Sequence, residues 1–128
     1  MEPDEKRSLI ERYINAYNTF DIEGMLALVH PDVAFKNVVS GQVNATAVGQ
    51  EELSRLAEES RGLFNSRYQT ILRFESADDQ ANVDVEFVGV LAMDLPNGLK
   101  KGQTLKLTGR SEFTFKEGTI YRITDITD

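Results

Sequence analysis

The apolar residues of this 128-residue chain change their spacing once, and that change limits the fold more than any other feature. Up to about residue 64 they recur mainly every three or four positions, which places side chains on one face of an α-helix. From about residue 68 they alternate with polar residues, as in strands that have one buried face. A group of helices followed by a group of strands is typical of an α+β fold. Without a visible linker or repeat, we expect residues 1–128 to form one domain.

Three helices are expected in the first half of the chain. The first begins near Leu9, and the third begins at about Gln50. Between them, a short helix over about residues 22–29 has Asp21 in the N-cap position. This helix must end before Pro31, because the residue preceding a proline disfavours helical geometry.

The segment after the second helix combines a strand pattern with a stretch that has no clear period. Alternation in residues 33–39 predicts a strand. Residues 40–49 are polar and rich in small side chains, so we expect a loop of about ten residues that covers a site. His30, the only histidine, is expected at the C-terminal end of the second helix, where an imidazole can bond the last carbonyls.

Four strands are expected in the second half of the chain, with turns rich in Asp, Asn and Gly between them. Their approximate ranges are residues 68–76, 82–95, 103–116 and 119–127. The second of these strands carries apolar residues on both faces. We expect its inner face to reach from Val83 to Met93, and its outer residues Val88, Val90 and Ala92 to form a homodimer interface.

Composition excludes several classes of function. The chain has 14 basic and 21 acidic residues, a net charge of −7, which argues against a nucleic-acid or anionic-membrane partner. With no cysteine and one histidine, we expect no metal and no other cofactor. The charged N-terminus is unlike a signal peptide and no apolar run is long enough to span a membrane, so we expect a cytoplasmic protein.

Three stretches carry a resemblance to the nuclear transport factor 2-like superfamily, chiefly its ketosteroid isomerase-like and SnoaL-like polyketide cyclase-like members. They are "RYINAYN" on the first helix, "FDIEGMLALVHPDVAF" and "GRSEFTF". The resemblance covers essentially the whole chain. It implies a cone-shaped half-barrel, in which a strongly curved, mostly antiparallel sheet wraps around three N-terminal helices and leaves an apolar cavity at one end. Many members of this superfamily are dimers.

The resemblance also assigns roles to particular positions. Tyr13 matches the tyrosine that stabilises an oxyanion in the isomerases, Asn37 stands where they place their carboxylate base, and Ser111 stands where they place a protonated acid. An amide cannot take up a proton at neutral pH, so isomerisation with the inherited base is not expected. We expect the cavity to be lined by aromatic and neutral polar side chains, namely Tyr13, Tyr17, Phe35, Asn37, Phe87, Ser111 and Phe113.

Two registers remain open for the last strand. In the register that extends the isomerase match, Ile120 and Arg122 face the cavity and Asp125 faces outward. In the other register, Asp125 lines the cavity, as the pocket acid of the polyketide cyclase-like members does. An epoxide hydrolase-like Asp-Arg-Asp set would need Arg122 with Asp84 or Asp125, which alternation along the strands does not bring together.

Two functions follow from these alternatives. The first is a binding domain that holds a small, largely apolar molecule without transforming it, because the residues placed inward are uncharged. The second is a cyclase- or isomerase-type enzyme that acts on an enolisable carbonyl compound with a relocated acid, Asp125 or Glu86. A carboxylate with a raised pKa inside the cavity would count strongly against the first function.

Overall fold

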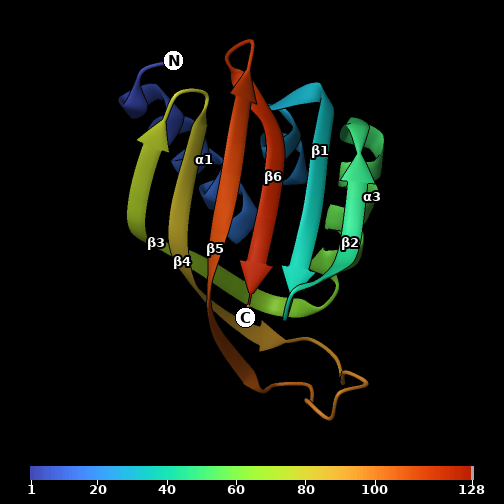
Figure 1. The fold of residues 1–128 in the computed structure, drawn as a ribbon. Helices are drawn as coiled ribbons and strands as arrows, with labels where there is room; N and C mark the ends of the chain where they lie inside the picture. Colours follow the sequence, from blue (N-terminus) through green and yellow to red (C-terminus); the bar gives the residue numbers. More distant parts are fainter. Residues whose placement is uncertain (128) are drawn as a thin grey trace.

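The computed structural model describes residues 1–127 and contains three helices and one open sheet of six strands (Figure 1). In chain order the elements are α1 (Pro3–Asn18), α2 (Ile22–Leu26), β1 (Val29–Val39), β2 (Gln42–Val48), α3 (Gly49–Arg61), β3 (Phe64–Ala77), β4 (Gln80–Leu91), β5 (Thr104–Lys116) and β6 (Thr119–Thr127).

The sheet has the strand order β2-β1-β6-β5-β4-β3, and the helices lie on one of its faces (Figure 1). Strands β1 and β6 run parallel, and every other neighbouring pair is antiparallel. This mixed, unclosed sheet with helices on its inner face confirms the α+β, cone-like fold expected from the sequence.

Capping residues mark the starts of α1 and α2. A capping box between Glu2 and Glu5, with Pro3 in the first turn, begins α1 earlier than the expected Leu9. Asp21 caps α2 as predicted, since its carboxylate accepts a hydrogen bond of 2.9 Å from the Gly24 amide. In the described part of the chain, no helix is both long and apolar enough to cross a membrane.

The structure corrects the prediction of a loop at residues 40–49. Ser40 and Gly41 both have positive φ angles, 51° and 79°, and they connect β1 to β2 as a tight hairpin. Two-residue hairpins with this backbone twist match the twist of the flanking strands. Strand β2 forms an edge of the sheet and is largely exposed. Val43, Ala45 and Ala47 alternate with polar residues, but the signal is weak because two of the three are alanines and only Ala47 is buried.

The prediction for His30 was also wrong. Helix α2 ends at Leu26, and β1 has begun by Val29, so His30 and Pro31 lie in a strand. The His30 Nδ1 atom accepts a hydrogen bond of 3.0 Å from the Asp32 amide, and the ring packs edge-on against Tyr121 at 5.1 Å. His30 is therefore a buried structural residue at the start of β1.

The far end of the β4–β5 hairpin differs from the expected alternation. Strand β4 ends at Leu91, so Met93, expected on the inner face, lies in the following loop and is 48% exposed. Leu107 of β5 is 39% exposed, because this part of the hairpin extends past the helices that cover the sheet (Figure 1). The inner face is therefore buried only along the part of the sheet that α1 and α3 cover.

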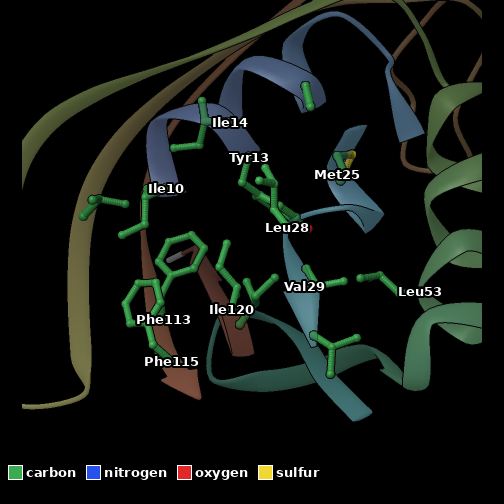
Figure 2. Packing of buried hydrophobic residues seen from close by; sticks show 14 of the residues in the cluster. Ile10, Tyr13, Ile14, Met25, Leu28, Val29, Leu53, Phe113, Phe115 and Ile120 are labelled. Atoms are coloured by element: carbon green, nitrogen blue, oxygen red, sulfur yellow. The ribbon is translucent and has the colours of Figure 1, made fainter. Parts of the chain in front are cut away.

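The core fills the space between α1, α2 and the inner face of the sheet. Figure 2 shows Ile10 and Tyr13 of α1 facing Phe113 of β5, with Leu28 and Ile120 beside them. Packing of this kind holds the helices on the sheet and fixes where α1 presents its polar side chains.

A buried lysine ties α1 to the turn between β3 and β4. Lys6 is 2% exposed, and its ammonium donates hydrogen bonds to the carbonyls of Asp78 at 2.7 Å and Gln80 at 3.4 Å. Lys6→Met keeps the apolar stem and leaves these carbonyls without their donor, so we expect a loss of about 1–3 kcal/mol in the free energy of unfolding. Urea unfolding measures it, with Arg12→Met on the exposed face of α1 as the control. Equal losses in both variants would contradict this role.

Candidate functional site

Three polar side chains lie side by side on the inner face of three neighbouring strands. Asp125 of β6 is the register partner of Asn37 on β1 and of Ser111 on β5. The Ser111 hydroxyl donates a hydrogen bond of 2.7 Å to the Asp125 carboxylate. The structure therefore places a carboxylate at the centre of a polar row, which corresponds to the register of the last strand that has Asp125 inside the cavity.

A β-bulge in β6 decides this orientation. Phe115 of β5 pairs with Ile120, and the preceding Thr114 pairs with Arg122, so Tyr121 has no partner on β5. The extra residue shifts the alternation by one position, so even-numbered residues face inward before the bulge and odd-numbered residues face inward after it. Ile120 faces inward before the bulge, whereas Ile123 and Asp125 face inward after it.

The register that placed Arg122 in the cavity was wrong for the same reason. Arg122 is exposed on the outer face of the sheet, immediately after the bulge. Asp84 also lies on the outer face, where it borders a groove with Arg73 and Arg110. The Asp-Arg-Asp set of an epoxide hydrolase is therefore not assembled from Arg122 and Asp84 in this structure.

Glu86, the second acid considered as a relocated catalytic group, also lies on the outer face of the sheet. It alternates with the inward-facing Val85 and Phe87 on β4 and lies 3.8 Å from the ammonium of Lys106. Asp125 is thus the acid that the structure places inside.

The polar row opens on a pocket of about 220 Å³ between α1, α3 and the sheet. Six of the seven residues expected to line a cavity border it: Tyr13, Tyr17, Phe35, Asn37, Ser111 and Phe113. The seventh, Phe87, borders a second hollow of about 230 Å³ that shares five residues with the first, among them Tyr17 and Asp125. The first pocket alone is smaller than the roughly 300–1,000 Å³ of sites for drug-sized ligands, so a small ligand fits it best.

Burial changes the proton affinity of the groups in this pocket. It raises the pKa of Asp125 to about 6, although the hydrogen bond from Ser111 opposes the rise. Burial likewise raises the pKa of Tyr17 to about 12 and that of Tyr13 further, and the charge of Asp125 adds to both. The tyrosines therefore stay protonated at neutral pH, while Asp125 titrates close to it.

Tyr13 is held with its hydroxyl available. Its ring packs edge-on against Phe113, with centroids 6.2 Å apart. Its hydroxyl has no hydrogen-bond partner within residues 1–127. Because no fully buried side-chain oxygen of these residues lacks a partner, the hydroxyl must be open to the pocket that Tyr13 lines. Tyr13 can therefore donate a hydrogen bond to a ligand.

Asn37 is less available than the sequence suggested. Its amide nitrogen donates a hydrogen bond of 2.9 Å to the side-chain oxygen of Asn44 on β2. The carbonyl end of the amide remains an acceptor that borders the pocket beside Asp125. Asn37 can position a ligand group, but it cannot act as the base that stands at this position in related isomerases.

The polar pocket residues of β3, Arg67 and Gln69, were missed by the sequence reasoning, as was the contribution of α2, α3 and β2 to the pocket wall. The expected strand began at residue 68, whereas β3 begins at Phe64, so Arg67 was left at a helix-to-strand junction. Both residues border the pocket, and Arg67 is 5% exposed. The alternation in β3 is weak, because this edge strand exposes Tyr68 and Leu72 as well as polar residues.

The raised pKa of Asp125 predicts a pH dependence of stability. Because its pKa rises from 3.8 to about 6 on folding, the folded protein binds this proton more tightly than the unfolded chain. Ionisation of Asp125 therefore costs stability as the pH rises through this range, at most about 3 kcal/mol. We expect Asp125→Asn to gain stability relative to the unmodified chain between about pH 4 and pH 7, measured by urea unfolding. If the difference in the free energy of unfolding between Asp125→Asn and the unmodified chain were the same at pH 4 and at pH 7, the raised pKa of Asp125 would be contradicted.

Comparison with known proteins identifies the family and the fold of this chain. The SnoaL-like domain model matches residues 10–123. The chain belongs to the SnoaL-like family. Among curated proteins, none matches it by sequence. The family assignment confirms the resemblance that the three sequence stretches carried.

Solved structures show the same SnoaL-like fold. A proposed polyketide cyclase from Xanthomonas campestris pv. campestris superimposes with a TM-score of 0.77 at 22% identity, covering 98% of this chain and 92% of the other. A ketosteroid isomerase-like protein from Catenulispora acidiphila, in complex with trimethylamine, gives 0.75 at 14% identity, with 91% and 82% covered. An epoxide hydrolase-like protein from M. tuberculosis gives 0.79 at 16% identity, with 100% and 86% covered. At these identities the likeness concerns the fold alone.

Proposed function

We propose that this SnoaL-like protein is a cyclase- or isomerase-type enzyme that binds a small, largely apolar carbonyl compound and moves a proton with Asp125. The observation that carries the proposal is the inward position of Asp125, hydrogen-bonded to Ser111 at 2.7 Å in a pocket that holds no other carboxylate among the described residues. A group that titrates near neutral pH in such a pocket can act as a general base and then as a general acid.

The arrangement suits proton abstraction beside a carbonyl group. In the proposed reaction the Asp125 carboxylate takes a proton from the carbon next to the carbonyl, and the electron pair of that C–H bond moves to form an enolate. The enolate oxygen accepts a hydrogen bond from Tyr13, whose raised pKa keeps its own proton in place. Protonated Asp125 then returns the proton to another carbon, or to the alkoxide that forms when the enolate carbon attacks a second carbonyl of the same molecule.

The direct test follows proton transfer without knowledge of the natural substrate. Small cyclic and aryl ketones are incubated with the protein in deuterium oxide, and deuterium at the carbon next to the carbonyl is measured by mass spectrometry. We expect exchange above the buffer rate for some of these compounds, and its loss in Asp125→Asn. Exchange that Asp125→Asn leaves unaltered would contradict the proposed role of Asp125.

A second candidate is binding without turnover, and the fixed amide of Asn37 favours it. The position that carries the base in related isomerases is here a neutral side chain held by Asn44. In that case the same ketones would bind with measurable affinity, and no deuterium would enter them. The inward carboxylate of Asp125 favours the enzyme.

The homodimer and the cytoplasmic location stay predictions from the sequence. Val88 and Val90 are only partly buried, on the outer face of β4, and Ala92 follows the end of that strand. A dimer formed through this face would be weakened by Val88→Lys, because a desolvated ammonium without a partner opposes association. Light scattering over a concentration series measures the mass; a monomer at all concentrations, or a dimer that Val88→Lys leaves intact, would contradict the prediction.

A further inference from the structure

Arg67 presents a buried positive charge beside the pocket. Its guanidinium lies over the rings of Tyr17 and Phe20, with its carbon 3.7 and 4.4 Å from the two ring centroids. The Nε atom donates a hydrogen bond of 2.9 Å to the backbone carbonyl of Tyr17, and one terminal nitrogen donates to the Ser60 hydroxyl at 3.4 Å. These contacts fix the plane and the direction of the guanidinium.

No acid pairs with this guanidinium in the described part of the chain. The ion pairs of Arg7, Arg55 and Arg110 all lie on the surface, whereas Arg67 is 5% exposed and has no carboxylate within 4.0 Å. A buried charge is normally paired, because its transfer from water is costly. The carbonyl ends of α1 and α3, where Tyr17 and Ser60 lie, offset part of the charge.

The two hydrogen bonds leave donors of Arg67 unused. A guanidinium has five N–H groups, and the Tyr17 carbonyl and the Ser60 hydroxyl take two of them. The side chain of Tyr17 takes at most one more, so at least two N–H groups of Arg67 stay free. The space next to Arg67 is the pocket that it lines together with Asp125.

We propose that Arg67 is a subsite for a carboxylate of the bound compound, so that the protein prefers a keto acid to a neutral ketone. A planar guanidinium with free N–H groups matches the geometry of a carboxylate, and its stacking on two aromatic rings keeps the guanidinium in a fixed orientation. The choice of a keto acid rests on the proposed function; the carboxylate subsite itself does not.

Arg67 and Asp125 line the same pocket, so one ligand can reach both side chains. Strand β3 is separated from β6 by β5 and β4, which corresponds to about 14 Å between strand axes along the sheet. The inward side chains shorten this gap, and Arg67 is not among the charges that shift the pKa of Asp125. The carboxylate would therefore sit several bonds away from the carbon that loses its proton.

The test compares two probes of the same shape, 3-phenylpropanoate and 3-phenylpropanamide, by calorimetry. We expect the unmodified protein to bind the carboxylate at least about tenfold more tightly than the amide, as a charge-assisted hydrogen bond predicts. Arg67→Gln should remove this preference. Arg73→Gln makes the same change on the exposed outer face of β3, where Arg73 pairs with Glu75, and should retain the preference.

Arg67→Gln also loses contacts that hold α1, so a second measurement needs no variant of that residue. The Nε–H signal of Arg67 should shift in ¹⁵N NMR spectra of the unmodified protein when the carboxylate probe is added, and not when the amide is added. Equal affinity for the two probes, or a signal that does not respond to the carboxylate, would overturn the inference. Carboxylate selectivity without deuterium exchange in any keto acid would leave the subsite standing and count against the proposed reaction.

Discussion

Asp125→Asn is expected to lower the rate of deuterium exchange by at least about 100-fold, since a positioned general base contributes about 10²–10⁴-fold to such reactions. The amide has nearly the shape of the carboxylate and can still bond Ser111, so the pocket should keep its form. Binding of the ketone is expected to change much less than the rate. The measurement is the initial rate of exchange at saturating ketone.

Glu86→Gln provides the matched control for this prediction. It makes the same chemical change on the outer face of the sheet, where Glu86 faces Lys106 at a distance of 3.8 Å. Exchange should proceed at the unmodified rate in this variant. A loss of exchange in Glu86→Gln comparable to that in Asp125→Asn would show that the two substitutions act through general damage to the fold.

Ile123→Ala is expected to destabilise the protein by about 2–5 kcal/mol, as the loss of a fully buried isoleucine side chain does. Ile123 is 1% exposed and faces the core directly after the bulge at Tyr121. Urea unfolding of the variant and of the unmodified protein gives the difference in the free energy of unfolding.

Ile126→Ala makes the same change three positions later, on the outer face of β6. Ile126 is the register partner of Arg110 and remains partly exposed, so its loss is expected to cost less than about half as much. An uninterrupted alternation from Ile120 would place Ile126 inside and Ile123 outside, and it predicts the opposite order. A larger loss from Ile126→Ala would therefore contradict the bulge.

The fold was largely predictable because its main elements have strong local signals. Periodicity located the helices and all four strands in the second half of the chain, and Asp21 marked the cap of α2. The edge strand β2 was missed, because its inward residues Ala45 and Ala47 are small and give only a weak alternation. The strand character of His30 was missed because Pro31 suggested a helix end, whereas the chain has already entered β1.

The apolar wall of the pocket could be predicted from the sequence, whereas its two charged residues could not. Tyr13, Phe35 and Phe113, which the spacing of aromatic residues in helices and strands pointed to, all border the pocket. The inward position of Asp125 depends on the bulge at Tyr121 in β6, and no turn residue or glycine in the sequence indicates that bulge. Arg67 depends on where β3 begins, and sequence patterns locate element ends less well than elements themselves.

The central claim is that Asp125 lies inside the pocket as a proton-transfer group, and its own titration tests this most directly. The ¹³C signal of the Asp125 side-chain carboxyl can be followed by NMR across the pH range, with Asp125→Asn to assign it. The structure predicts a midpoint near 6, because burial raises the pKa of this carboxyl. A midpoint at the ordinary value of 3.8 would place the carboxylate in water and contradict the account.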